Sequence, residues 1–254
     1  MKDQVTIIIG LGQLGRIFAG GFLRNGTIVI PVNRGDDMHL AAAKWPVPEL
    51  VLVAVAEGDL HPVLANLPEV WRDRVGLIQN ELLPRDWLRH GIESPTVASV
   101  WFEKKKGMDA KPLIATPIHG PVADFMAKSL MGIDIPARVV ESEEALLFEL
   151  VRKNVYILTT NIAGIKTGGN VGELWANHRE FALTVANEVL DIQDWLTNTM
   201  NDREKLVKGM VEAFDADPQH GCMGRSAPAR LARNLAFADE AGLAVPTLRA
   251  IAQS

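Results

Sequence analysis

The first residues that could do chemistry form a glycine-rich run near the start of the chain, Gly10-Leu11-Gly12-Gln13-Leu14-Gly15. An apolar run, Val5 to Ile9, precedes it, and apolar residues at helical spacing follow it. Between a strand and a helix, such glycines permit a tight turn and let the backbone approach a pyrophosphate at the helix N-terminus. The run therefore predicts a dinucleotide site. The alternative is a turn with a purely structural role.

Asn33-Arg34 follows the second apolar run, residues 27–32, and bears on which dinucleotide is bound. At this place an acidic residue usually binds the ribose 2′-hydroxyl of NAD, whereas arginine meets the 2′-phosphate of NADP. Asp36 and Asp37 come next. They could instead reach the ribose, or they could be exposed loop acids. We predict NADP, bound through Asn33 and Arg34.

Two further groups carry polar side chains that suit carbonyl chemistry. Gln79-Asn80 ends the fourth apolar run, at the sheet edge where ligands bind, so Asn80 could hold a nicotinamide or a substrate carbonyl, or simply cap a turn. Lys153 lies in a mostly apolar helical pattern, and Asn161 follows within about 80° of the same face. An ammonium group in a cleft can protonate a carbonyl oxygen during reduction, and a solvated helix lysine is the alternative.

The elements that must position these residues divide the chain into two parts. Short apolar runs with helical crossovers between them predict a doubly wound parallel sheet of the Rossmann type. We expect strands near residues 5–9, 27–32, 50–55, 75–78, 96–102, 113–116 and 137–140, and a helix over 119–131. From Ser142, a good N-cap, only amphipathic helices are predicted. We therefore place an NADP-binding Rossmann domain at 1–141 and an all-helical substrate and dimerisation domain at 142–254.

Composition excludes several classes of function. A net charge of −5 over 254 residues argues against nucleic-acid binding, which needs clustered cations. No apolar run is long enough for a membrane helix, and no secretion signal is evident, so we expect a cytoplasmic protein without membrane contact. The single cysteine, Cys222, excludes an internal disulfide, and with only His220 nearby we predict no metal site.

In the order and spacing of these motifs the chain resembles the ketopantoate reductase family over nearly its whole length. The resemblance rests on the glycine run, Arg34, the Gln-Asn pair, the spacing from Lys153 to Asn161, and the segments Gly172-Glu173-Leu174, Glu188-Val189 and Gly242 to Pro246. Members of this family reduce a 2-oxo acid with NADPH, using a Rossmann domain and a helical domain around a central cleft. A dimer through the helical domain is also implied.

The resemblance assigns roles to individual residues. It implies that Lys153 is the general acid, that Asn80 contacts cofactor and substrate, and that Asn161 holds the substrate. Arg225-Ser226-Ala227 corresponds best to a late Arg-Thr-Glu segment of the family, which adds Ser226 to the substrate-binding residues. The expected glutamate is missing there, because Ala227 takes its place.

Three other positions depart from the family pattern. Glu81 stands where glycine is usual, Ala56 where lysine is expected, and Ile157 where asparagine is expected. Because lost polar contacts change which substrate a site prefers, we expect a substrate other than the family's own. The first hypothesis is an NADPH-dependent reductase of a small 2-oxo acid. The alternatives are a catalytically silent NADP(H)-responsive binding protein and a hydroxyacid dehydrogenase with an unrelated substrate.

Overall fold

The computed structural model describes residues 4–104 and 107–253. The chain forms two compact units, Met1–Glu149 and Leu150–Ser254. The division falls inside the long helix α6 (Glu143–Thr167), which starts just after the boundary expected between residues 141 and 142. The first turns of α6 are therefore counted with the sheet unit.

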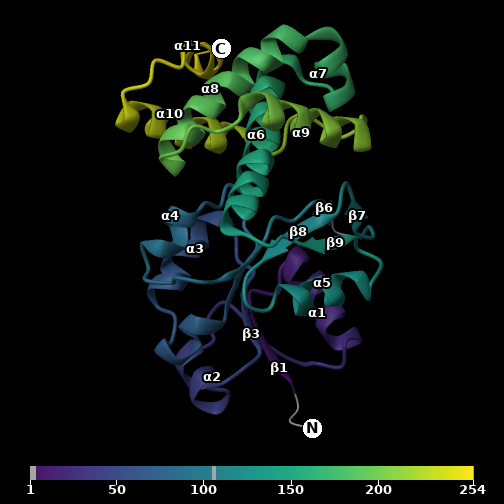
Figure 1. Ribbon diagram of the computed structural model, residues 1–254, viewed down its shortest axis with the longest axis vertical. Coiled ribbons are helices and arrows are strands. Elements are labelled where there is room, and N and C mark those ends of the chain that lie inside the picture. Colours follow the sequence, from purple (N-terminus) through teal and green to yellow (C-terminus); the bar gives the residue numbers. More distant parts are fainter. Residues whose placement is uncertain (1–3, 105–106, 254) are drawn as a thin grey trace. The chain divides into compact units, whose positions relative to one another are not determined.

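The first unit is built on a seven-stranded sheet with the order β2-β1-β3-β4-β5-β8-β9. Figure 1 labels β1, β3, β8 and β9 of this sheet. The strands are β1 (Val5–Ile9), β2 (Ile28–Val32), β3 (Leu50–Val53), β4 (Val75–Leu77), β5 (Thr96–Ala98), β8 (Thr116–His119) and β9 (Ala137–Val139). Strands β1 and β3 are fully buried, as their continuous apolar sequences require. The chain runs from β1 outward to β2 and then crosses back to β3. This reversal creates a switch point at the carboxyl ends of β1 and β3.

The doubly wound parallel sheet is confirmed, with one departure, because β5 and β8 pair in the antiparallel sense. No helical crossover joins them. Instead the chain passes through a small two-stranded sheet, β6 (Phe102–Glu103) with β7 (Lys111–Pro112), and such a reversal allows antiparallel pairing. The strand expected over 96–102 is accordingly split into β5 and β6, and the one expected at 113–116 begins only at Thr116.

The helices of the first unit cover both faces of this sheet. They are α1 (Gln13–Arg24), α2 (Met38–Lys44), α3 (Glu57–Ala65), the 3-10 helix η1 (Glu69–Arg74), α4 (Pro84–Leu88) and α5 (Ala123–Met131). Helix α5 starts later than the predicted His119. A turn at Gly120 precedes it, where φ is +120° and an added Cβ would lie 2.5 Å from the carbonyl oxygen of Pro95. Only glycine fits this turn.

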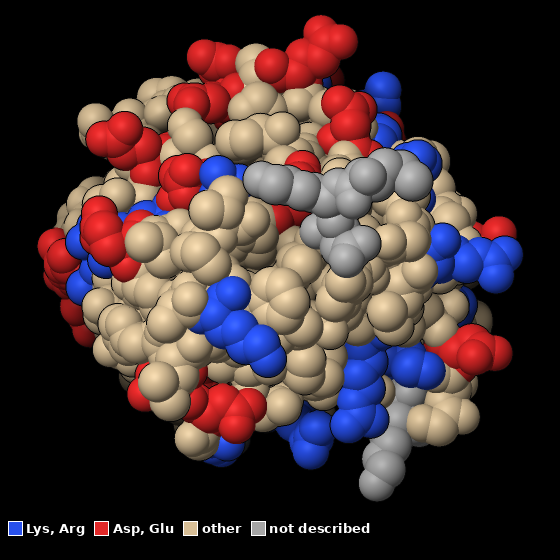
Figure 2. All heavy atoms as spheres, turned by 90° about the horizontal axis from the view of Figure 1, so that it is seen from below, with Lys and Arg blue, Asp and Glu red and all other residues tan. Residues whose placement is uncertain are grey.

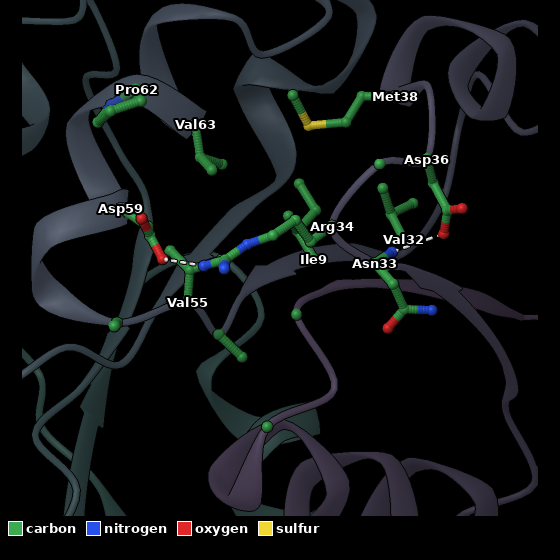
Figure 3. Close-up of a pocket in the computed structure, with 15 residues that line it drawn as sticks. Ile9, Val32, Asn33, Arg34, Asp36, Met38, Val55, Asp59, Pro62 and Val63 are labelled. Carbon is green, nitrogen blue, oxygen red and sulfur yellow. Dashed lines mark hydrogen bonds and ion pairs between the residues drawn. The ribbon is translucent and has the colours of Figure 1, made fainter.

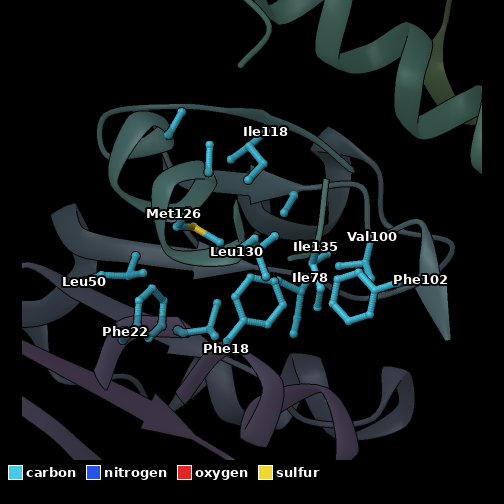
Figure 4. Packing of buried hydrophobic residues seen from close by; sticks show 14 of the residues in the cluster. Phe18, Phe22, Leu50, Ile78, Val100, Phe102, Ile118, Met126, Leu130 and Ile135 are labelled. Carbon is cyan, nitrogen blue, oxygen red and sulfur yellow. The ribbon is translucent and has the colours of Figure 1, made fainter. Parts of the chain in front are cut away.

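The core of the first unit lies where α1 and α5 pack on one face of the sheet (Figure 4). Phe18 and Phe22 of α1 meet Met126 and Leu130 of α5, and all four are buried. Gly21 permits this contact, because a Cβ there would lie 2.5 Å from the carbonyl oxygen of Ser129. The apolar face of α1 predicted from sequence is thus used to fix the helix that follows the glycine run.

The second unit is helical, as predicted. After α6 it contains α7 (Val171–Asn177), α8 (Arg179–Thr197), α9 (Arg203–Ala216), α10 (Ala227–Ala241) and α11 (Pro246–Ala252). Glu188 of α8 is buried, and its two carboxylate oxygens accept hydrogen bonds from the amides of Thr247 and Leu248, each 2.9 Å long. Glu188 thereby satisfies the first amides of α11 and joins two helices.

Within 4–104 and 107–253, no helix combines the length and apolar character needed to cross a membrane. The same residues hold no cluster of three or more His, Cys, Asp or Glu placed to bind a metal. On the face shown in Figure 2, acidic and basic side chains stand in small groups separated by other residues.

Candidate dinucleotide and substrate site

A cavity of about 460 Å³ opens at the carboxyl ends of β1, β2 and β3, which is the switch point of the sheet (Figure 3). Its lining residues are Ile9, Gly10, Gly12, Val32, Asn33, Arg34, Gly35, Asp36, Met38, Ala54, Val55, Ala56, Asp59, Pro62 and Val63. Loops after three strands and the start of α3 contribute them. The predicted glycine run and the Asn33-Arg34 pair therefore meet in one cavity.

The three glycines of the run have different geometric roles. Gly10 has a φ of +95°, which favours glycine. A Cβ on Gly15 would lie 2.2 Å from the carbonyl oxygen of Gly10, so the first turn of α1 can pack on the strand end only with glycine there. A Cβ on Gly12 would meet nothing within 4 Å, because this residue borders open space. Gly12 is also the N-cap of α1, without a side-chain cap, so the amides of Gln13 and Leu14 begin the helix uncapped.

Arg34 and the acids beside it form the far wall of the cavity. The side chain of Arg34 is 91% exposed, and its Nη2 lies 3.1 Å from Oδ2 of Asp59 on α3. Asp36 Oδ2 accepts a hydrogen bond of 2.7 Å from the backbone amide of Asn33. Asp37 does not line the cavity. It is the N-cap of α2, and its side chain accepts hydrogen bonds from the amides of His39 and Leu40.

The Gln79-Asn80 pair lies at the carboxyl end of β4 and makes two kinds of contact. Gln79 Nε2 donates to the carbonyls of Val53 and Val55, at 2.8 and 3.2 Å, and so ties β4 to the end of β3. Asn80 Nδ2 donates to Oε1 of Glu57 at 3.1 Å. Gln79 is thus structural. The side chain of Asn80 contacts the first residue of α3, and Asn80 is not among the residues that line the cavity.

Helix α3 is also joined to the segment around α4. His61 Nδ1 lies 3.0 Å from His90 Nε2, and its Nε2 lies 3.8 Å from Oδ1 of Asp86. Burial raises the pKa of the Asp86 carboxyl above its usual value. Desolvation, followed by the charges of His61, Arg89 and Arg72, lowers the pKa of His90. These contacts fix the helix that supplies Asp59, Pro62 and Val63 to the cavity.

The other predicted site residues belong to the helical unit. Lys153 of α6 is buried, with 8% of its surface exposed. Asn161, two turns further along α6, accepts a hydrogen bond of 2.9 Å at Oδ1 from Nη1 of Arg230 on α10. Ser226 is the residue before α10 and makes no side-chain cap there. The structure thus places Asn161 against Arg230, a partner that the sequence analysis did not name.

Among the residues that sequence reasoning missed are two acids, Asp59, which lines the cavity, and Glu57, which contacts Asn80. Both lie in the first turn of α3, directly after the third strand. A sequence signal was present, because acids at the start of a helix that follows a parallel strand fall at the ligand edge of the sheet. Their partners, Arg34 and Asn80, come from other strand ends and could be found only from the fold.

Comparison with known proteins bears on the fold. No protein-family model and no curated protein matches the sequence. A probable 2-dehydropantoate 2-reductase of Bacillus subtilis superposes with a TM-score of 0.70 at 18% identity, covering 98% of each chain. A ketopantoate reductase of Ralstonia eutropha reaches 0.68 at 16% identity, over 98% of this chain and 96% of that one. This chain has the ketopantoate reductase fold. A D-mandelate dehydrogenase bound to NADH and anilino(oxo)acetate has the same fold, with a TM-score of 0.68 at 14% identity, over 98% of this chain and 96% of that chain.

Within the ketopantoate reductase fold, the positions that depart from the family pattern can now be located. Ala56 is the N-cap of α3 and lines the cavity, so a short apolar side chain stands where a lysine was expected. Glu81 adopts a left-handed backbone with φ of 60°, the conformation that glycine favours. Ile157 and Ala227 are buried, the latter as the first residue of α10. Position 81 thus has a backbone geometry that glycine favours, although it holds a glutamate.

The sole cysteine does not behave as a reactive group. Cys222 is fully buried against Gly164 of α6. Burial, with a smaller contribution from the charge of Glu173, raises the pKa of its thiol to about 11. Because the thiolate is the reactive form, the cysteine is inert near neutral pH.

Proposed function

We propose that this protein is an NADPH-dependent oxidoreductase that reduces the carbonyl of a small 2-oxo acid to a 2-hydroxy acid. The observation that carries the proposal is the single cavity at the switch point, with the glycine run on one side and Arg34 on the other. Membership of the ketopantoate reductase family, as a divergent member, is part of the proposal. The fold shared with two such reductases and with an NADH-bound dehydrogenase supports it.

The residues of the cavity fit a dinucleotide. The open space at Gly12 and the uncapped start of α1 suit a pyrophosphate, with the backbone of Gly10 to Gly15 around it. Asn33 and Arg34 would hold the adenosine ribose and its 2′-phosphate. Bound there, NADPH would supply the hydride for the carbonyl carbon. The chain itself contributes orientation, charge and a proton.

In this proposal Lys153 donates its proton to the carbonyl oxygen as the hydride reaches the carbon. The balanced reaction converts the 2-oxo acid, NADPH and one proton into the 2-hydroxy acid and NADP⁺. A positioned general acid contributes about 10²- to 10⁴-fold to such a rate. Asn80 would orient cofactor and substrate, and Asn161 and Ser226 would bind the substrate. The burial of Lys153 supports its role, because a solvated helix lysine would be largely exposed and only 8% of Lys153 is.

The test combines turnover with cofactor binding. NADPH oxidation is followed against a panel of 2-oxo acids that includes ketopantoate, and NADPH binding is measured by fluorescence. Lys153→Ala should lower turnover about 10²-fold or more while NADPH binding stays within about 2-fold. Lys166→Ala, an exposed lysine on the same helix, is the matched control. Turnover within a few-fold of wild type in Lys153→Ala would show that the proton comes from elsewhere.

A second candidate keeps the cofactor without the chemistry. It is favoured by one specific feature, namely that Asn80 and Asn161 are both hydrogen-bonded to other side chains of the protein, Glu57 and Arg230. A dinucleotide-responsive binding protein would bind NADPH but oxidise it with no panel member. Turnover only with acids unlike ketopantoate would instead indicate a hydroxyacid dehydrogenase with an unrelated substrate.

The remaining expectations concern the protein's setting. We propose a cytoplasmic homodimer that associates through the helical unit. The lone, buried cysteine suits a reducing compartment. Light scattering of the purified chain tests the dimer, and a mass of one chain at micromolar concentration would contradict it.

A further inference from the structure

The cation of the cavity is paired with an acid of the same cavity. Arg34 follows β2, Asp59 lies in the first turn of α3, and their side chains meet at 3.1 Å across the opening (Figure 3). Both groups are substantially exposed, at 91% and 52%. An exposed pair of this kind is worth about 0 to 1 kcal/mol, so a ligand can exchange one partner for another.

The charges around Arg34 oppose a phosphate. Among the described residues that line the cavity, Arg34 is the one with a positive charge, and Asp36 and Asp59 carry negative charges. Asp36 is held in its turn by the amide of Asn33, so Asp59 is the acid that contacts the guanidinium. A phosphate monoester brings a further charge of about −1.5 to −2 near neutral pH. It must therefore either displace Asp59 from Arg34 or share the guanidinium with it, and in both cases it lies close to the Asp59 carboxylate.

An unphosphorylated ribose meets a different environment. Its hydroxyl groups are hydrogen-bond donors, and a carboxylate at this edge of the sheet is the acceptor that NAD sites use. Asp59 could accept such a bond without releasing Arg34, because the 3.1 Å contact with Arg34 uses Oδ2 and the other carboxylate oxygen is not part of it. Asp59 thus weakens the advantage that Arg34 gives to the phosphorylated ligand, and it tolerates the unphosphorylated one.

We propose that Asp59 tunes cofactor choice by competing with the 2′-phosphate of NADP(H) for Arg34. This competition reduces the preference of the protein for NADP(H) over NAD(H). This inference rests on the proposed dinucleotide function of the cavity. It predicts that the wild-type protein binds both cofactors with a modest difference. It also predicts that removal of the Asp59 charge strengthens the binding of the 2′-phosphate to Arg34, and so increases the preference for NADP(H).

The experiment measures dissociation constants of NADPH and NADH by fluorescence for the full chain and its Asp59→Asn variant. NADPH should bind about 3- to 10-fold more tightly to the variant, as loss of one exposed competing charge allows, and NADH affinity should change less than about 2-fold. The gain should shrink at about 1 M salt, where charges are screened within about 3 Å. Asp124→Asn is the control, because Asp124 lies in the first turn of α5, outside the cavity lining, and its loss changes net charge equally.

A second variant shows whether Asp59 acts through Arg34. In an Arg34→Ala background, Asp59→Asn should raise NADPH affinity by a smaller factor than in the wild type. Equal factors in both backgrounds, or a wild-type shift no larger than that of Asp124→Asn, would overturn the role of Asp59 while leaving the dinucleotide site intact. Failure of the wild-type protein to bind either cofactor would overturn the site itself, and the inference with it. Thermal melts of all variants confirm that each is folded.

Discussion

The glycine run in the sheet unit and the surroundings of Asn161 in the helical unit fix their candidate ligands by different means. At the run, Gly10 and Gly15 act through backbone shape, since one has a positive φ and the other admits no Cβ. At Asn161, a side-chain amide meets the side chain of Arg230. A backbone site depends on residues that nothing can replace. A side-chain site can change its partners.

The largest effect expected from this comparison comes from adding one methyl group to the glycine run. In Gly15→Ala the new Cβ would lie 2.2 Å from the carbonyl oxygen of Gly10, so α1 must shift. We expect a loss of about 1 to 3 kcal/mol in the free energy of unfolding and no measurable NADPH binding. Denaturant titration and cofactor fluorescence check both.

Gly20→Ala provides the control on the same helix. A Cβ there meets nothing within 4 Å, and alanine raises helix propensity by up to about 1 kcal/mol. This variant should be at least as stable as the wild type and bind NADPH normally. If Gly15→Ala behaved in the same way, the run would not be a constrained backbone site.

In the helical unit, the next largest effect concerns a polar residue whose role is structural. Glu188→Ala leaves the amides of Thr247 and Leu248 without their acceptors in a buried place. We expect a loss of about 1 to 3 kcal/mol in unfolding free energy, with NADPH affinity unchanged. Glu180→Ala on the exposed side of α8 is the matched control. A stable Glu188→Ala variant would mean that α11 is held by its apolar contacts alone.

The same division, between backbone features and side-chain pairs, separates what the sequence could predict from what it could not. The strands β1 to β4 and the glycine run were predictable, because buried runs and glycine spacing are local signals. The antiparallel β8 was not, since no local pattern in residues 96–119 tells a hairpin from a crossover. Two pairs could be found only from the fold, because their members are far apart in sequence. Arg34 and Asp59 are 25 positions apart, and Asn161 and Arg230 are 69 positions apart.

Glu81 tests both kinds of constraint at once, because it has a charged side chain on a left-handed backbone. A non-glycine residue in the left-handed region costs about 1 to 2 kcal/mol. Glu81→Gly should therefore raise the unfolding free energy by about 1 kcal/mol, which a shift in thermal midpoint would register. Asn198→Gly, at the left-handed C-cap of α8, should give a smaller gain because asparagine tolerates this region. A loss of stability in Glu81→Gly would show that the Glu81 side chain outweighs its backbone strain.

The smallest effect expected is a pH dependence of stability and of NADPH affinity, which arises at His90 and acts on the cavity through α3. The pKa of His90 is lowered below 6.5 in the folded protein, so the unfolded chain takes up the proton more readily. The stability contributed by neutral His90 is present above pH 6.5 and is lost as the pH falls through the lowered value. Asp86, whose pKa is raised above 3.8, acts in the opposite sense. His90→Gln should thus flatten the decline in thermal midpoint as the pH falls below about 6.5. Because His61, the partner of His90, lies on the helix that carries Asp59, the same substitution should reduce any loss of NADPH affinity over that range. A wild-type decline that persists unchanged in His90→Gln would place its origin outside this histidine pair.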